Sequence, residues 1–557
     1  MSSRSQRLRR HAACTALAVI AGTMLSAGPA TALARPAGTT AAGAALGPRA
    51  DLNQDRRGDL LIRTPWGTAR ALTETDGSSK GYTYALHGEG TRSARDVLAL
   101  GDVRGGGGTE LLLWSADGHL AMSQAGAHSS QAPTWTGTGW QRYDKLVAVN
   151  DVTGDGRGDL LARTPAGTLY LYRTTGSATG NPFAAAVRVG TGWGQYDQLV
   201  GANDLDADGR ADLIAKSPDG RLYYYEGTGR AAAPFKARTL VGGGWNAYSK
   251  IIASDNFGRN KAGLLAVTPE GVLYFYPGKG HGAFEPRLRF GAPTSVIPPW
   301  NTADVFVNSG VTPVYGKHGV DAVDASGAVR EYTGLTDGHF LPVHPALDKK
   351  LPAGRTLVSA AAVTADNRPT RYSWNGSALT ELLTGKAVKG SFAGTRTVVG
   401  PGDLTGDGKG DLLTRDSRGT LWLRAGTGSP TEFAKPVKVG PGWGGYRQIV
   451  GAGDMSGDGR ADLVATDAAG QLFRYRGTGR ADAPFSARES VGGGWKAYDT
   501  LAAPGDLNGD GRADLLARDA AGTLWLHRST GLTGSKAFAG RSVVEKGWSA
   551  SVYRQFN

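Results

Sequence analysis

The chain has 557 residues, a formal net charge of +13 and 40% hydrophobic residues. That length is too great for one ordinary hydrophobic core and indicates several domains or a repeat architecture. The 85 glycines and 26 prolines stay below the share of roughly 25–30% that is typical of a disordered chain. With 13 Trp and 19 Tyr, this composition favours short strands joined by tight turns over long helices. Because Lys and Arg are scattered singly, we expect no nucleic-acid partner.

The N-terminal segment has the pattern of a secretory signal. Arg4 to Arg10 form a basic region, Cys14 to Leu25 an apolar region, and Ala32 to Ala34 an A-x-A cleavage site. We therefore predict a signal peptide over residues 1–34, a flexible leader over 35–50, and a secreted, extracellular protein. Cys14 is the only cysteine, so the mature chain lacks disulfides and bound metal is one way to stabilise it. No later stretch is apolar enough to insert into a membrane, and we expect a monomer.

One acidic loop of nine residues recurs along the chain and is the most informative feature of the sequence. Six copies carry oxygen-bearing side chains at positions 1, 3, 5 and 9, and an Arg or Lys at position 7. Degenerate copies start at Asp102 and Asp255. Positions 1, 3, 5, 7 and 9 of the six copies are Asp51, Asn53, Asp55, Arg57, Asp59; Asp151, Thr153, Asp155, Arg157, Asp159; Asp204, Asp206, Asp208, Arg210, Asp212; Asp403, Thr405, Asp407, Lys409, Asp411; Asp454, Ser456, Asp458, Arg460, Asp462; and Asp506, Asn508, Asp510, Arg512, Asp514.

The same frame surrounds most loops. A Gly-Trp-x-x-Tyr segment precedes the loop, and an apolar run, a Gly turn and an aromatic strand follow it. The first five loops start 51, 49, 53 and 51 residues apart, and the last three 51 and 52 residues apart. Two worn units fill the interval between Asp255 and Asp403, around Asp321 to Gly327 and Arg371 to Gly376.

Ten units of about four short strands each predict an all-β fold of β-propeller type, because propeller blades are four-stranded sheets. We expect two tandem five-bladed rings, one over residues 51–300 and one over 301–557. The second ring would hold the two degenerate blades and three well-formed repeats. One larger ring is the alternative. The C-terminus carries a spare Gly-Trp segment at Trp548, and this last strand could complete an incomplete first blade.

The acidic loops have the donors of a site for a hard cation. Alternate residues on a tightly turning backbone point toward one centre, and the backbone carbonyl of position 7 could add a donor. Six to eight oxygen ligands suit calcium, whereas magnesium demands stricter octahedral geometry and zinc prefers His or Cys. Three carboxylates on nine residues would repel one another without a cation. The sequence therefore predicts about six Ca²⁺ sites. It leaves open whether the degenerate segments near 102, 255, 313 and 360 bind metal.

The loops, their period and the Asp-Leu-Leu strands that follow, as in Asp59-Leu-Leu61 and Asp159-Leu-Leu161, resemble FG-GAP/VCBS repeats of secreted bacterial proteins, akin to the integrin α-chain propeller. This resemblance spans about residues 51–557. It implies calcium ligation by positions 1, 3, 5 and 9 in the six loops. The Gly-Trp-x-x-Tyr segments also look like those of tachylectin-type propeller lectins.

The sequence favours a binding module over an enzyme. It has no Walker loop, no His-Glu-x-x-His and no cysteine after Cys14 that could act as a nucleophile, so we expect no catalytic residues. We expect a partner that is a glycan or a cell-surface protein, and the leading hypothesis is glycan binding. A protein-interaction scaffold and a polysaccharide hydrolase are the alternatives. The aromatic residues of the repeats could stack on sugars or could pack neighbouring blades together: Trp140, Tyr143, Trp193, Tyr196, Trp245, Tyr248, Trp443, Tyr446, Trp495 and Tyr498.

Overall fold

The computed structural model describes residues 46–557, except 65–67, 76–77, 88–93, 106, 178–179, 258–261, 291–299, 301–302, 304, 312–315, 342–345 and 365–367. The predicted signal peptide and most of the predicted leader thus lie outside the described residues. Within the described residues the fold is all-β, and its helical segments are single 3-10 turns. No helix in this part of the chain is long and apolar enough to span a membrane.

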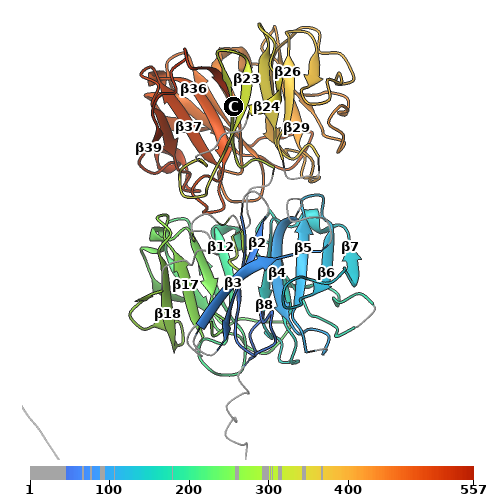
Figure 1. Ribbon diagram of the computed structural model, residues 1–557, viewed down its shortest axis with the longest axis vertical. Coiled ribbons are helices and arrows are strands. Elements are labelled where there is room, and N and C mark those ends of the chain that lie inside the picture. Colours follow the sequence, from blue (N-terminus) through green and yellow to red (C-terminus); the bar gives the residue numbers. More distant parts are fainter. Residues whose placement is uncertain are drawn as a thin grey trace, which may run out of the picture. The chain divides into compact units, whose positions relative to one another are not determined.

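The strands of the described residues form ten antiparallel sheets, most of them with four strands (Figure 1). We number the sheets in chain order; the first contains β21, β1, β2 and β3 in that spatial order, and the next four contain β4–β7, β8–β11, β12–β15 and β16–β20. Their strands are β1 (Leu60–Arg63), β2 (Ala69–Thr75), β3 (Ser78–Tyr84), β4 (Ala94–Gly101), β5 (Glu110–Ser115), β6 (Leu120–Gln124), β7 (Trp135–Gly137), β8 (Lys145–Val149), β9 (Asp159–Arg163), β10 (Leu169–Tyr172), β11 (Val187–Gly190), β12 (Gln198–Asn203), β13 (Asp212–Lys216), β14 (Leu222–Tyr225), β15 (Thr239–Gly242), β16 (Lys250–Ala253), β17 (Gly263–Val267), β18 (Leu273–Gly280), β19 (Ala283–Phe284), β20 (Leu288–Arg289) and β21 (Val305–Phe306).

The sixth sheet runs β24, β23, β22, β40, and the seventh to tenth contain β25–β27, β28–β31, β32–β35 and β36–β39. These strands are β22 (Gly319–Asp324), β23 (Ala328–Thr333), β24 (Ala346–Lys350), β25 (Thr356–Ala360), β26 (Thr370–Trp374), β27 (Leu379–Glu381), β28 (Thr395–Gly402), β29 (Asp411–Asp416), β30 (Leu421–Arg424), β31 (Val437–Gly440), β32 (Tyr446–Gly453), β33 (Asp462–Asp467), β34 (Leu472–Tyr475), β35 (Glu489–Gly492), β36 (Tyr498–Gly505), β37 (Asp514–Asp519), β38 (Leu524–His527), β39 (Ser542–Glu545) and β40 (Tyr553–Phe556). The sixth and seventh sheets contain the two worn units of the sequence.

The 3-10 turns mostly mark the Gly-Trp-x-x-Tyr segments. In each of these turns the preceding glycine adopts a left-handed conformation, as Gly192 does with φ 85°. Glycine suits this position because it has no Cβ to clash with the following carbonyl. The turns are η1 (Trp140–Arg142), η2 (Trp193–Gln195), η3 (Trp245–Ala247), η5 (Trp443–Gly445) and η6 (Trp495–Ala497), and η7 (Gly534–Lys536) lies outside the motif.

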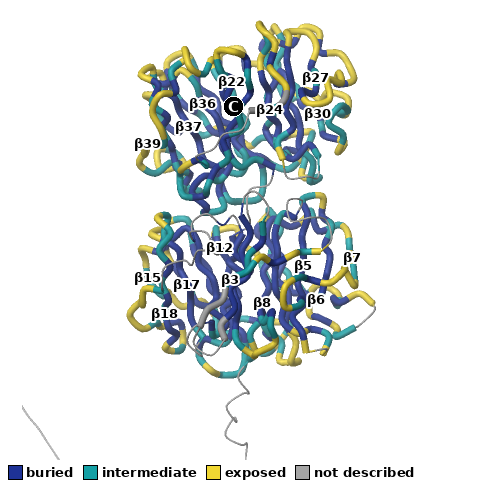
Figure 2. The backbone as a smooth tube through the Cα atoms, viewed as in Figure 1, coloured by how far each residue is buried: buried dark blue, intermediate teal, exposed yellow. Residues whose placement is uncertain are grey.

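Hydrophobic clusters between neighbouring sheets form two closed cycles. Five clusters join the first sheet to the second and so on to the fifth, which packs back against the first. Five others join the sixth to the tenth sheet and return to the sixth. The inner strands are accordingly buried, while outer strands such as β15 and β39 and many of the connecting loops are more exposed (Figure 2). We infer from this packing that each cycle is a five-bladed propeller.

The apolar runs that follow the acidic loops reflect this sandwiching. In β9, Leu160 and Ala162 pack toward the second sheet, whereas Leu161 packs toward the fourth. Successive side chains of a strand point to opposite faces. A strand with both faces covered therefore needs a continuous apolar run and not an alternating pattern.

Each cycle is completed by a strand from its far end. β21 pairs with β1 through Ile62 and Phe306, and β40 pairs with β22 through Ala322 and Phe556. The C-terminal strand thus completes the sixth sheet and not the first. Because β21 belongs to the first sheet, the first cycle extends past residue 300, where the sequence had placed the boundary.

The end of the predicted leader is part of the structured core. Arg49 is fully buried and Ala50 nearly so. The Arg49 side chain donates hydrogen bonds to Asp255 and to the carbonyl of Ala148, and Gly47 accepts a hydrogen bond from Asn150. Residues 46–50 are therefore not a free leader, because they bond to β8 at Ala148 and to the loops at Asn150 and Asp255.

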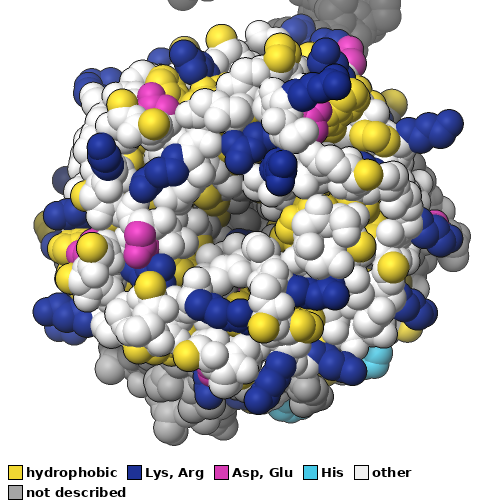
Figure 3. All heavy atoms as spheres, turned by 90° about the horizontal axis from the view of Figure 1, so that it is seen from above, with side chains coloured by type: hydrophobic (Ala, Val, Ile, Leu, Met, Phe, Trp, Pro, Cys, Tyr) yellow, Lys and Arg dark blue, Asp and Glu magenta, His cyan; other side chains and the backbone are white. Residues whose placement is uncertain are grey.

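Lys and Arg side chains are spread over the face that lies uppermost in Figure 1 (Figure 3). They surround a central hollow and are interspersed with uncharged groups (Figure 3). This distribution fits the single, scattered basic residues of the sequence.

The closing strand β40 provides a stability test. Phe556 is 2% exposed and packs on Trp548. We expect Phe556→Ala to lower the free energy of unfolding by about 3–5 kcal/mol, the usual cost of truncating a buried Phe. Val552→Ala is the control, because Val552 is 44% exposed. Chemical denaturation followed by Trp fluorescence measures both. Equal denaturation midpoints for the two variants would contradict closure through β40.

Candidate metal centres

Each of the six acidic loops leads into the second, buried strand of its sheet. The loop that starts at Asp151 connects β8 to β9, and its ninth residue, Asp159, is the first residue of β9. Five of the six loops have this position between two paired strands, and the loop at Asp51 leads directly into β1. The rigid strand therefore fixes the position of the ninth-residue carboxylate.

The Asp at position 1 organises the loop by accepting backbone hydrogen bonds. In the second loop, Asp151 Oδ1 accepts from the N–H of Gly154 at 2.6 Å and Oδ2 from that of Gly156 at 2.6 Å. Asp403, Asp454 and Asp506 accept from the corresponding glycines at 2.6–2.7 Å. Such Asx-type turns hold the backbone in a tight curve.

Positions 5 and 7 are coupled in a way that the sequence analysis missed. The carboxylate at position 5 accepts the backbone N–H of position 7, as Asp208 does from Arg210 at 2.9 Å. The position-7 side chain also pairs with this carboxylate: Arg210 Nη1 lies 3.1 Å from Asp208 Oδ2, and Arg512 Nη2 lies 2.6 Å from Asp510 Oδ2. The basic residue at position 7 thus offsets part of the loop's negative charge.

The position-9 carboxylates are the most buried acidic groups of the loops. All six are 0–5% exposed. Four of them accept a hydrogen bond from the backbone N–H of a residue that follows the third strand of the sheet. Asp411 Oδ1, for example, accepts from the N–H of Gly426 at 2.8 Å. Oδ1 of Asp59 and of Asp159 is buried with no hydrogen-bond partner among the described residues. These oxygens are suited to accept a cation, because a buried anionic oxygen without a partner is costly.

Burial and mutual repulsion hold these carboxyl groups toward their protonated form. Desolvation raises the pKa of Asp59 to about 8, and the neighbouring Asp51 and Asp55 charges add to the rise. Burial likewise raises the pKa of Asp212 and of Asp411 to about 8 and that of Asp159 to about 7. A bound cation would favour the charged form instead.

The donor sets fit calcium. All of the side-chain groups at positions 1, 3, 5 and 9 carry oxygen, and in the third loop the carboxylates of Asp204, Asp206 and Asp208 have one oxygen each within 4.8 Å of one another. Position 3 lies beside position 1: Thr405 Oγ1 and Ser456 Oγ are 3.3 Å from Asp403 and Asp454. Calcium tolerates such irregular oxygen sets better than magnesium does. Calcium binding itself stays a prediction.

At the degenerate loop that starts at Asp255, the guanidinium of Arg49 lies beside the first carboxylate. Arg49 donates to Asp255 through its backbone N–H at 3.0 Å and through Nε and Nη2 at 2.9 and 2.8 Å. Where the loop has lost its oxygen donors, a buried guanidinium thus balances the first carboxylate. The other degenerate loop keeps the turn, since Asp102 accepts the N–H groups of Gly105 and Gly107 at 2.7 and 2.8 Å.

The aromatic residues that the sequence offered as sugar contacts are buried. The five Trp side chains are 7–8% exposed and the five Tyr side chains 1–9%. They pack on the third strand of their own sheet: the Trp193 ring centroid lies 4.9 Å from that of Tyr225, and Tyr196 OH lies 2.7 Å from Tyr225 OH. Their main observed contacts are therefore structural, and their ligand role stays a prediction.

An arginine completes each aromatic group, and sequence reasoning missed it. The guanidinium carbon of Arg287 lies 4.2 Å from the Tyr274 ring centroid, and that of Arg488 lies 4.4 Å from the Phe473 ring centroid. Arg488 also donates to Tyr446 OH at 2.7 Å. A signal existed, because Arg238, Arg488 and Arg541 each stand seven residues before a Gly-Trp tryptophan.

A groove of 680 Å³ opens beside one of these aromatic groups. It is lined by Trp245, Tyr248, Tyr276, Phe284 and Arg287, together with the glycines of the 242–244 turn. The Trp245 ring lies 4.9 Å from the Tyr276 ring, centroid to centroid. Aromatic edges, a guanidinium and open backbone thus meet at this groove.

The raised pKa values give the calcium-free protein an unusual pH dependence. Carboxyl groups with an ordinary pKa near 3.8 and a folded-state pKa near 7–8 bind more protons in the folded state. The free energy of unfolding should therefore fall as pH rises between about 4 and 8. We expect the melting temperature of metal-free protein to be lower at about pH 7.5 than at about pH 5, and saturating calcium to remove this decline. A metal-free protein whose melting temperature rises steadily over this range would contradict the account.

A family model described as FG-GAP-like repeat matches residues 151–215 and 403–465. No curated protein matches the sequence. Among solved structures, the chain is similar to the BP39L lectin from Burkholderia pseudomallei, with 15% identity, 72% of this chain and 99% of that chain covered, and a TM-score of 0.26.

It is also similar to BBS1N in complex with ARL6DN, with 12% identity, 65% of this chain and 97% of that chain covered, and a TM-score of 0.22. The family match falls on loops whose hydrogen bonds are described above: each matched segment starts at a position-1 Asp. The chain therefore contains FG-GAP-like repeats, and its described residues form an all-β fold of ten blade-like sheets.

Proposed function

We propose that this chain is a secreted, calcium-binding β-propeller protein that acts as a non-catalytic binding module for extracellular or cell-surface glycans. The observation that carries the calcium part is the common architecture of six loops, each with a buried position-9 carboxylate beside two further acidic side chains. The secretory pattern of residues 1–34 supports an extracellular location, where calcium is abundant. The predicted mature chain has no cysteine and therefore no disulfide that could stabilise it.

Calcium would stabilise the folded chain by linkage. An ion that binds the folded but not the unfolded state raises the free energy of unfolding by an amount set by its concentration relative to its dissociation constant. Calcium sites of extracellular modules bind at about 10⁻⁴–10⁻³ M. Calcium would take the role that crosslinks have in other secreted domains.

The glycan part rests on the groove beside Trp245. Sugars present both apolar ring faces and hydroxyl groups, so they bind where aromatic groups and hydrogen-bond donors meet. The groove combines Tyr276 and Phe284 with the exposed Arg287. Trp245, at 7% exposure, would support this surface from below.

The variant Asp514→Asn distinguishes the calcium-bound loop from the metal-free loop. Asp514 is fully buried, and burial together with the Asp510 and Asp506 charges raises its pKa well above the ordinary value. The variant should lose one calcium per chain and part of the calcium-induced rise in melting temperature, while its metal-free melting temperature should not fall. Asp482→Asn is the control, since that side chain is 70% exposed. Equal calcium-induced rises in wild type and Asp514→Asn would contradict calcium ligation by this loop.

Arg287→Ala tests the groove. We expect a glycan array to reveal saturable binding by the wild-type protein, and the variant to bind the same glycan at least about tenfold more weakly, which corresponds to one lost charge-assisted hydrogen bond. Arg480→Ala is the control, because Arg480 is 66% exposed, pairs with Asp482 and is not among the residues that line the groove. No glycan binding, together with recovery of one stable protein partner from culture supernatant, would replace the glycan module by a protein scaffold.

A further inference from the structure

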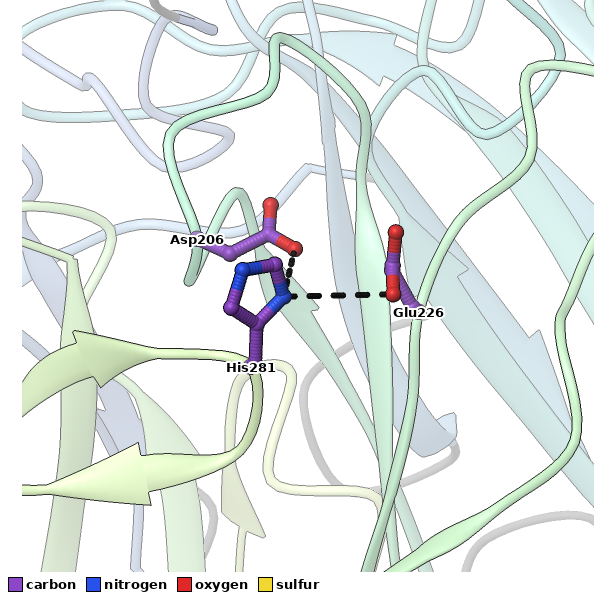
Figure 4. Close-up of side chains that lie close together, drawn as sticks. All are labelled: Asp206, Glu226 and His281. Carbon is purple, nitrogen blue, oxygen red and sulfur yellow. Dashed lines mark ion pairs between the residues drawn. The ribbon is translucent and has the colours of Figure 1, made fainter. Parts of the chain in front are cut away.

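A mixed nitrogen and oxygen cluster stands beside the third acidic loop. His281 Nδ1 lies 3.2 Å from Asp206 Oδ2 and 3.9 Å from Glu226 Oε2 (Figure 4). One possible ligand atom from each of these three residues lies within 4.8 Å of the other two. Glu226 and His281 belong to no acidic loop, and only Asp206 is shared with the predicted calcium site.

The three side chains come from two neighbouring sheets. Asp206 lies in the loop between β12 and β13, and Glu226 directly follows β14 of the same sheet. His281 lies at the tip of the hairpin between β18 and β19 of the fifth sheet. The cluster therefore joins two sheets at one edge, as the side chains in Figure 4 show.

The hairpin is held closely against the fourth sheet. A Cβ on Gly282 would lie 2.7 Å from Tyr224 Cβ, and one on Gly278 would lie 3.3 Å from the Leu205 carbonyl. Tyr224 in turn donates a hydrogen bond to Asp206 Oδ2 at 3.1 Å. Close backbone contact and a supporting hydrogen bond thus position both His281 and Asp206 before any ion binds, as the outer shell of a metal site does.

Asp206 is a buried carboxylate with one oxygen that lacks a hydrogen-bond partner among the described residues. Its side chain is 0% exposed, and its Oδ1 has no hydrogen-bond partner among the described residues. A fully buried carboxylate with an unpartnered oxygen is costly unless a cation is present. With Oδ2 toward His281 and Oδ1 without a partner, one carboxylate has oxygen atoms for two neighbouring cations.

We propose that Asp206, Glu226 and His281 bind a divalent transition-metal ion of the zinc type, distinct from the calcium of the acidic loops. Imidazole nitrogen suits zinc and related ions, whereas calcium takes oxygen ligands. Around a tetrahedral ion with bonds of about 2.1 Å, donor atoms stand about 3.4 Å apart. The distances from His281 Nδ1 to the two carboxylate oxygens, 3.2 and 3.9 Å, bracket this value.

The site is open on one side. The His281 side chain is 79% exposed and that of Glu226 20%, so a fourth position remains for water or for an external ligand. Lys236 pairs with Glu226 through Oε1, which leaves Oε2 toward the imidazole. This inference does not depend on the proposed glycan function, and its ligands differ from those of the other five loops.

The test measures zinc binding to the full chain in excess calcium by isothermal titration calorimetry. Wild-type protein should bind one Zn²⁺ per chain. His281→Asn should weaken this binding at least about tenfold, and Asn tolerates the left-handed backbone that His281 adopts with φ 48°. Glu226→Gln should weaken it as well. The calcium-dependent melting temperature should stay unchanged in both variants.

His339→Asn is the matched control. His339 Nδ1 lies 3.4 Å from Asp337 Oδ1 with 63% of the side chain exposed, and among the described residues it belongs to no group of three ligands. Zinc affinity equal to wild type in His281→Asn, or no saturable zinc binding by wild type, would overturn the proposal and leave His281 as an ion-pair partner of Asp206. Zinc binding that needs His281 in a protein insensitive to calcium would retain this site and reject the calcium loops.

Discussion

The structure depends on how it compensates carboxylates held at the ends of buried strands. In each of six loops, a position-9 aspartate is fixed in the interior by its strand, while positions 1 and 5 bring two further negative charges beside it. Backbone N–H groups satisfy part of this charge, as at Asp151. Repulsion and desolvation remain, and they raise the pKa of the innermost group. A hard cation is the simplest way to reverse both.

The loops that depart from the repeat also show that buried carboxylates need a neighbouring positive charge. At Asp255 the loop has lost its additional oxygen donors, and the buried Arg49 balances the remaining carboxylate. At the third loop an additional histidine and glutamate approach the third-position Asp206. At Asp255 a protein cation thus balances the carboxylate, whereas at Asp206 the additional glutamate adds negative charge and increases the need for a cation. The third acidic loop therefore adjoins the proposed zinc-type site.

Much of the fold followed from periodicity. The repeat of the acidic loop and of the Gly-Trp-x-x-Tyr segment predicted blade-like sheets, and ten of them are present in the described residues. The strands that close the two cycles were harder to predict from the sequence, because β21 has only two residues and follows an interrupted pattern. The leader prediction failed at Arg49, since one buried ion pair with a residue 206 positions away leaves no local signal.

The site was predictable to the level of the loop and no further. Fixed oxygen positions revealed the loops, whereas the pairing of Arg210 with Asp208 and the approach of His281 depend on three-dimensional neighbours. The aromatic residues illustrate the opposite limit: recurrence identified Trp193 and Tyr196, but only the fold revealed that their rings are buried against Tyr225. A residue repeated in every blade serves the packing of each blade first.

Counting the calcium ions bound to the full-length mature chain tests the central claim most directly. Native mass spectrometry across a calcium titration should reveal up to six added calcium ions, one for each loop with oxygen donors at positions 1, 3, 5 and 9. A folded chain that retains no specifically bound calcium at millimolar concentrations, on the order of the weakest extracellular modules, would contradict the account.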